Sequence, residues 1–218
     1  MNTITRIVLI ALLAIPLAPA MAAGPVAGKD YTKVDPALPP ADPAKVSVTE
    51  FFSYQCPHCY RFAKSYAAWT AGLPADVKTD RAAVAIGHQA WAASAQAFYA
   101  LSVLKAVPRI DDAFFMAIHQ ERKPLTDEAG ITNWVAGQGI DRTKFQNAYR
   151  SFSVKLQTTR ADDLSRAVKL PSVPTLLIDG KYLVPIADDG DFADQLAIAK
   201  TLVERARSER AAVRKVAP

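Results

Sequence analysis

Cysteine is scarce in this sequence, with Cys56 and Cys59 the only two among 218 residues. Two cysteines so close together can close one small ring, so no framework of disulfides holds the fold together. Histidine is nearly as rare, with three residues. A structural zinc site takes four ligands and usually two cysteine pairs. The sequence therefore argues against both a disulfide scaffold and a structural metal site.

Long apolar runs and a strong excess of one charge are also missing. After residue 22, no apolar run approaches the length of about 20 residues that crosses a bilayer. The formal net charge is only +5, and no stripe of Lys and Arg alternates with aromatic residues. The sequence therefore predicts no nucleic-acid partner. A composition that is 50% hydrophobic and 22% charged is typical of a globular protein.

Residues 1–22 predict a signal peptide. Arg6 precedes the apolar run 7–15, and small residues with prolines lead to Ala20-Met21-Ala22. This order is typical of a cleavable secretory signal, and the run is too short for a membrane anchor. We therefore expect cleavage after Ala22 and a soluble, exported protein in an oxidising compartment.

The remaining pattern predicts an α/β fold. Residues 46–52 alternate with period two, which indicates a strand, and a second strand is expected over 82–86. Two apolar runs joined by Asp179-Gly180 predict a hairpin, and an amphipathic helix is expected from Phe192 onward. Its basic end, residues 205–215, reads as a solvated helix face.

Between residues 88 and 153 the apolar and aromatic residues recur at helical spacing, and we expect these aromatics, including Phe152, to pack in a core. Helix starts are expected at Asp111 or Asp112, at Thr126 and at Asp141. The predicted organisation is a signal peptide (1–22), an α/β domain (23–87 with 154–218) and an inserted helical domain (88–153).

The segment Cys56-Pro57-His58-Cys59 lies where a strand leads into a helix, and Pro57 suits the first helical turn. Unpaired N–H groups and the helix dipole would stabilise a Cys56 thiolate there, and His58 could add a positive charge or a hydrogen bond. Covalent haem attachment needs His after the second cysteine, where Tyr60 stands. The pattern predicts a redox-active dithiol that cycles with its disulfide.

Glu50 is the one charged residue in the alternating strand. It shares a strand face with Val46, Val48 and Phe52. If that face is buried, the carboxyl pKa rises and Glu50 can exchange protons with Cys59. The alternative is that Glu50 lies on an exposed face or at a frayed strand end.

Three segments together resemble the DsbA family of periplasmic thiol–disulfide oxidoreductases. They are Glu50–Phe62, which contains the cysteine pair, Val173-Pro174-Thr175 with the hairpin that follows, and Gly28–Thr32 near the N-terminus. The resemblance implies a thioredoxin fold interrupted by a helical domain. One departure is the turn Lys169-Leu170-Pro171-Ser172, where many relatives have a glycine-containing turn.

The resemblance also implies roles for the site residues. Cys56 would be the exposed sulfur that forms a mixed disulfide with substrate, and Cys59 the buried leaving thiol. Pro174 would be cis beside the disulfide, and Val173 would offer backbone groups to an extended substrate. No cofactor is implied beyond the Cys56–Cys59 disulfide.

The expected partners are reduced exported polypeptides and a DsbB-like quinone-linked membrane protein that reoxidises the site, with the protein itself a monomer. Three alternatives remain open at this point. The first two are a disulfide isomerase, although residues 23–45 are too few for the dimerisation domain that family isomerases carry, and a reductase. The third is a peptide-binding chaperone whose cysteines are incidental.

Overall fold

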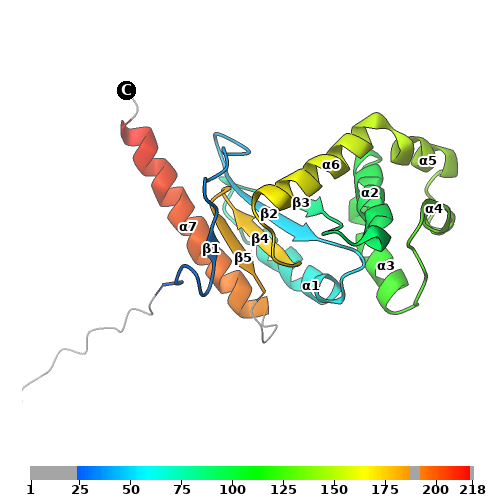
Figure 1. Cartoon of the computed structure of the whole chain (residues 1–218), viewed down its shortest axis with the longest axis horizontal. Coiled ribbons are helices and arrows are strands. Elements are labelled where there is room, and N and C mark those ends of the chain that lie inside the picture. Colours follow the sequence, from blue (N-terminus) through cyan, green and yellow to red (C-terminus); the bar gives the residue numbers. More distant parts are fainter. Residues whose placement is uncertain (1–23, 187–191, 217–218) are drawn as a thin grey trace, which may run out of the picture.

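The protein is built around one five-stranded sheet with the strand order β1-β5-β4-β2-β3. Figure 1 shows it in a computed structural model that describes residues 24–186 and 192–216, so the expected signal peptide lies outside the described residues. Strands β2 and β3 run parallel, and the other neighbouring pairs are antiparallel. The strands are β1 (Thr32–Lys33), β2 (Val46–Phe52), β3 (Val77–Ala83), β4 (Thr175–Ile178) and β5 (Tyr182–Pro185).

Helices cover both faces of the sheet. On one face, Val48 of β2 shares a core with Phe62 of α1 and Leu202 of α7. On the other face, Phe51 packs into a core that continues into the helices between β3 and β4. The helices are α1 (Pro57–Ala71), α2 (Gln89–Val103), α3 (Val107–His119), α4 (Glu128–Gly137), α5 (Arg142–Arg150), α6 (Phe152–Ala167) and α7 (Phe192–Val216).

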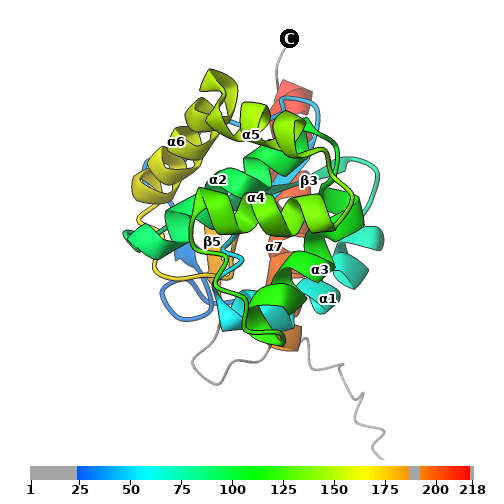
Figure 2. The same ribbon diagram turned by 90° about the vertical axis from the view of Figure 1, so that its right-hand side faces the viewer.

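The five helices α2 to α6 follow one another between β3 and β4 and face the viewer in Figure 2. This arrangement confirms the expected α/β fold with a helical insertion, and the predicted hairpin and C-terminal helix are also present. Helix α6 spans the boundary that the sequence suggests at residue 153. Within residues 24–186 and 192–216, no helix has both the length and the apolar character needed to cross a membrane.

The expected second strand is misplaced. The sequence predicts this strand over residues 82–86, whereas β3 spans Val77–Ala83. It pairs in register with β2 from Val46 onward. Residues 78–81 are polar, so this strand lacks the alternation of apolar residues by which a strand is predicted from sequence. Because β3 is one of the two edge strands of the sheet, charged side chains can remain in contact with water there.

Two of the expected helix starts are wrong. Asp111 and Asp112 lie in the second turn of α3, because that helix begins at Val107. Helix α4 is capped by Asp127, whose side chain accepts a hydrogen bond from the Gly130 N–H, rather than by Thr126. The predicted start of α3 is therefore late by about one turn, and that of α4 is early by one residue.

Two other expectations concern the two ends of α5. Asp141 caps that helix as predicted and accepts from the Lys144 N–H at 2.7 Å. Phe152 does not pack in the core as expected, since α5 ends at Arg150 and Phe152 begins α6 with 80% of its surface exposed.

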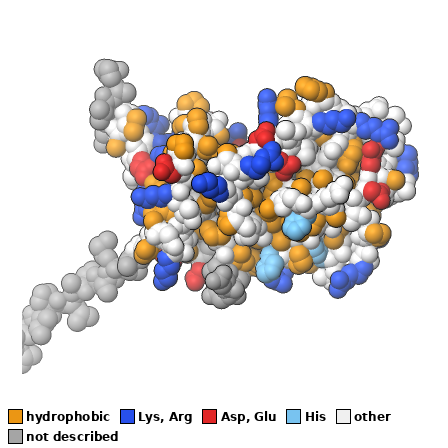
Figure 3. Space-filling view, in the orientation of Figure 1, with side chains coloured by type: hydrophobic (Ala, Val, Ile, Leu, Met, Phe, Trp, Pro, Cys, Tyr) orange, Lys and Arg blue, Asp and Glu red, His pale blue; other side chains and the backbone are white. Residues whose placement is uncertain are grey.

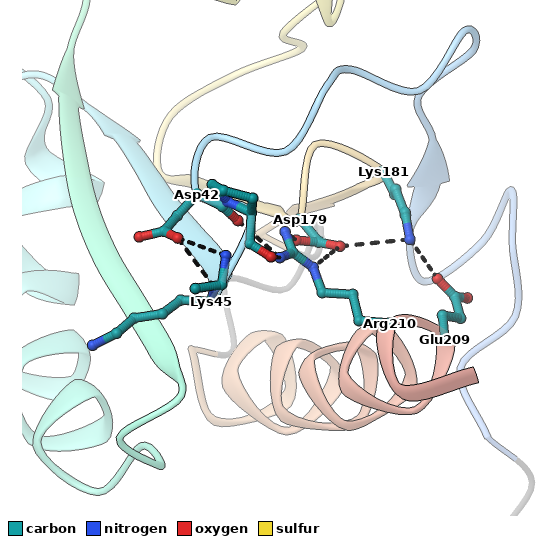
Figure 4. A network of polar contacts seen from close by, with 8 residues as sticks. Asp42, Lys45, Asp179, Lys181, Glu209 and Arg210 are labelled. Carbon is teal, nitrogen blue, oxygen red and sulfur yellow. Dashed lines mark hydrogen bonds and ion pairs between the residues drawn. The ribbon is translucent and has the colours of Figure 1, made fainter. Parts of the chain in front are cut away.

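The basic end of α7 is anchored as far as Arg210, whereas residues 211–214 are exposed as expected. Arg210 forms an ion pair with the buried carboxylate of Asp179, and its Nη1 donates to the carbonyl of Asp42 at 2.8 Å (Figure 4). Lys181 joins the same network, 3.5 Å from Asp179 and 2.8 Å from Glu209. The network ties α7 to the β4–β5 turn and to the segment that precedes β2.

Candidate active site

The two cysteines lie at the junction of β2 and α1. Cys56 is the N-cap of α1 and Pro57 follows as the first helical residue, as predicted. The Cys59 N–H donates to Cys56 Sγ at 3.4 Å. Both cysteines are free thiols in this structure, which therefore describes the dithiol form, and Cys59 is fully buried.

The loop before β4 lies over Cys56. The Val173–Pro174 peptide bond is cis, as the family resemblance implies, and Cys56 Sγ donates to the Val173 carbonyl at 3.4 Å. The expectation of an exposed Cys56 is wrong for this form, because the sulfur points toward Val173 and the residue is only 4% exposed. Buried Gln195 of α7 donates to the carbonyls of Pro174 and Val184 and so holds this loop.

The turn that leads into this loop contains a lysine with a positive φ angle. Lys169 has a φ of +52°, in the left-handed region where glycine is the least strained residue. A lysine therefore adopts this backbone conformation, and the chain continues through Leu170 to the cis peptide bond.

The two thiols have opposite proton affinities. The pKa of Cys56 is lowered to about 7 by a hydrogen bond from the Cys59 thiol, and further by the backbone N–H groups of Cys59 and His58 and the charge of Arg61, although burial opposes this. Burial raises the pKa of Cys59 well above its usual range, and the neighbouring Cys56 thiol raises it further. Near neutral pH Cys56 is therefore about half ionised, while Cys59 stays protonated.

Of the two effects expected of His58 on Cys56, a positive charge or a hydrogen bond, the hydrogen bond is present. The His58 imidazole lies on the exposed side of α1, where Nδ1 accepts from Arg61 Nη2 at 3.1 Å. His58 lowers the pKa of Cys56 through its backbone N–H, while the positive charge that lowers it further belongs to Arg61. Sequence reasoning missed Arg61, although its spacing of three residues from His58 places both on one helix face.

Glu50 is buried, as predicted for a core-facing strand position, with no exposed surface. Burial raises the pKa of its carboxyl group, and Arg81 opposes that shift through an ion pair of 2.7 Å between Nε and Oε2. The other carboxylate oxygen, Oε1, has no hydrogen-bond partner within the described part of the chain. The charge of Glu50 contributes to the raised pKa of Cys59, so the two groups are coupled electrostatically.

Arg81 links Glu50 to the helical insertion. Its Nη1 donates to Asp111 of α3 at 2.8 Å, and the Tyr54 hydroxyl donates to the same carboxylate at 2.5 Å. The guanidinium also lies 3.8 Å from the ring centroid of Phe52. These partners come from separate segments of the chain, and no local pattern in the sequence could have identified them.

The two remaining histidines are a hydrogen-bonded residue and a surface residue. His119 donates from Nε2 to the Tyr54 carbonyl at 2.8 Å and stacks on Tyr60, and His88 is exposed at the start of α2. Among the residues that the structure describes, no group of three or more His, Cys, Asp or Glu side chains could hold a metal ion.

Comparison with known proteins agrees with this geometry. The thioredoxin family model matches residues 41–195. The chain is 36% identical over 189 residues to the thiol:disulfide interchange protein DsbA of Pseudomonas aeruginosa, covering 87% of this chain and 88% of the relative. It is also 36% identical over 181 residues to DsbA of Azotobacter vinelandii, covering 83% and 84%.

Solved structures give the same result. The crystal structure of Pseudomonas aeruginosa DsbA matches with a TM-score of 0.80 at 35% identity, covering 84% of this chain and 95% of that one. The crystal structure of DsbA from Xylella fastidiosa matches with a TM-score of 0.78 at 30% identity, covering 84% and 98%. These similarities confirm a thioredoxin fold with an inserted helical domain.

Proposed function

This chain belongs to the DsbA family and is a thiol–disulfide oxidoreductase, and we propose that it donates a Cys56–Cys59 disulfide to reduced polypeptides exported to the periplasm. The observation that carries the direction of the reaction is the contrast between the two thiols. The Cys56 thiolate is stabilised in the dithiol form, which favours reduction of the enzyme's disulfide and makes that disulfide the stronger oxidant.

The reaction transfers two electrons from the client to the enzyme. A client thiolate attacks Cys56 Sγ, the Cys56–Cys59 bond breaks, and Cys59 leaves with the electron pair and takes up a proton. A second client thiolate then attacks the client sulfur of the mixed disulfide and releases Cys56 as a thiolate. The client loses two electrons and two thiol protons. The enzyme gains both electrons and one proton, which Cys59 holds, and the second proton passes to the solvent because Cys56 leaves as a thiolate.

We assign the other site residues supporting roles. Pro57 starts the helix whose N–H groups stabilise Cys56, and His58 supplies one of these groups. Glu50, buried and coupled to Cys59, would deliver the proton that Cys59 takes up on leaving. Val173 and Pro174 would offer backbone groups to an extended client once the Cys56 thiol no longer occupies the Val173 carbonyl.

The setting of the reaction follows the family. We propose that residues 1–22 direct export, that residues 23–87 with 154–218 carry the redox centre, and that residues 88–153 form the inserted domain. A DsbB-like, quinone-linked membrane protein would reoxidise the dithiol, and the enzyme would act as a monomer without a cofactor. The isomerase, reductase and chaperone alternatives are not favoured, since the relatives are thiol:disulfide interchange proteins.

Equilibration of the purified protein in graded glutathione buffers tests the proposed direction. We expect a Cys56–Cys59 reduction potential less negative than about −150 mV, compared with about −270 mV for a thioredoxin-like dithiol. A value below about −230 mV would overturn the assignment as an oxidase. Cys56→Ala should abolish oxidation of client thiols, whereas a chaperone would retain its activity.

A further inference from the structure

A groove of about 600 Å³ lies between α1 and α3. The two helices run beside each other in both Figure 1 and Figure 2. Side chains of α1 line one wall and side chains of α3 the other. The residues that the argument uses are Tyr60, Arg61 and Lys64 from α1 and Asp112, Phe115 and Met116 from α3.

The middle of the groove is apolar and accessible. Met116 is 47% exposed although it is a large hydrophobic residue. Beside it the rings of Tyr60 and Phe115 lie 6.0 Å apart, and the Tyr60 hydroxyl accepts a hydrogen bond from Gln120. A flexible thioether next to aromatic rings suits binding of apolar side chains of varied shape.

Two residues that line the groove are close neighbours of the redox centre in the chain. Tyr60 follows Cys59 directly, and Arg61 contacts His58 inside the cysteine pair. A chain segment bound through its cysteine to Cys56 would therefore find this groove among its nearest surfaces. This continuity favours an occupant that is already held at the active site over an unrelated ligand.

Charge is distributed unevenly along the groove. Arg61 and Lys64 lie one helical turn apart on exposed positions near the cysteine end, and Lys64 forms no ion pair with the side chains that the structure describes. Asp112 lies at the other end, since α3 runs from it toward His119, which stacks on Tyr60. On the face drawn in Figure 3, Lys and Arg lie in several places, and acidic side chains are close to some of them.

We propose that this groove binds the segment of a reduced client polypeptide that flanks its reacting cysteine. An apolar client side chain would lie on Met116, and an acidic one beside Arg61 and Lys64. The inference rests on the proposed function, because it names the client sequences that the same redox centre oxidises most readily.

The test compares a reduced two-cysteine peptide carrying Leu and Asp beside one cysteine with dithiothreitol as a small dithiol. Met116→Glu should raise KM for the peptide about tenfold, as expected for loss of one buried apolar contact. Lys64→Glu should raise it about threefold. Neither variant should change the rate with dithiothreitol.

Matched controls separate the groove from general surface effects. Val103→Glu changes a residue of nearly the same exposure, 48%, and Lys155→Glu changes an exposed lysine of α6, and neither residue lines the groove. Both should leave the peptide KM unchanged. A peptide with Lys in place of Asp should reverse the order, so that Lys64→Glu binds it better than the unaltered protein.

The outcomes are distinguishable. An unchanged peptide KM in Met116→Glu, or an equal rise in the controls, would overturn the groove proposal. So would a concentration-dependent change in oligomeric state without an effect on KM, which would assign the groove to a second copy of the chain. Failure of the unaltered protein to oxidise dithiothreitol and peptide alike would count against the proposed function instead.

Discussion

The stability of the dithiol form should rise with pH over the range in which Cys56 ionises. The pKa of Cys56 lies at about 7 instead of 9.0, chiefly because the Cys59 thiol donates a hydrogen bond to the Cys56 sulfur. Cys56→Ser removes the ionising group but keeps a small polar side chain at the N-cap of α1. The difference in unfolding free energy between the two proteins isolates the Cys56 contribution.

The size of the effect follows from the difference in pKa between the folded and unfolded states. Each pKa unit corresponds to about 1.4 kcal/mol, so the depressed value would stabilise the fold by about 2 kcal/mol once partial screening by water is allowed for. Because the folded pKa is the lower one, this stabilisation is complete above pH 9.0 and is lost as pH falls through about 7. The contribution of Cys59 to the pH dependence of stability has the opposite sign. Its raised pKa makes stability fall once the unfolded thiol ionises above about 9.

Urea denaturation of both proteins under reducing conditions measures this difference at intervals from about pH 6 to about pH 9. The unfolding free energy of the unaltered protein should increase relative to that of Cys56→Ser as the pH rises. Cys59→Ala should make this increase smaller, because it removes the hydrogen bond from the Cys59 thiol. A difference that stays flat across the range would refute the account of a stabilised thiolate.

Three further predictions concern other parts of the molecule. Arg210→Met should lower the free energy of unfolding by about 3 kcal/mol, because it leaves the buried Asp179 carboxylate without its main partner, and adding Asp179→Asn should restore most of the loss in urea denaturation. A loss below about 1 kcal/mol would mean that Lys181 compensates. Glu50→Gln should slow the release of Cys59 at neutral pH by at least about tenfold in rapid-mixing experiments while leaving the pKa of Cys56 near 7, and an unchanged rate would exclude proton delivery by Glu50. Asp141→Ala should cost about 1 kcal/mol in thermal unfolding through loss of its cap on α5, and no measurable loss would contradict that role.

Local signals predicted the elements around the redox centre well. The alternation over 46–52 and the position of Pro57 suffice to locate β2 and the start of α1, because both depend on interactions within a few residues. The Asp179-Gly180 turn similarly predicts the hairpin of β4 and β5. The same kind of signal failed for β3, whose polar residues reflect its place at the edge of the sheet.

The sequence by itself determined the chemistry, because the spacing of Cys56 and Cys59 at a helix start specifies a redox dithiol wherever that helix lies in the fold. It also indicated that Glu50 would be buried, since strand alternation assigns it to the face of Val48. Only the tertiary structure decided how the site is tuned. The cover over Cys56 comes from Val173, which lies 117 residues farther along the chain.

The charge partners were decided in the same way. Arg81 lies 31 residues from Glu50, and Arg210 lies 31 residues from Asp179. A buried charge is stable only beside a partner that packing brings within hydrogen-bond distance. A local sequence pattern does not show which distant residue will be that partner. Local periodicity therefore determined where the reactive sulfurs lie, and packing between distant segments determined their environment.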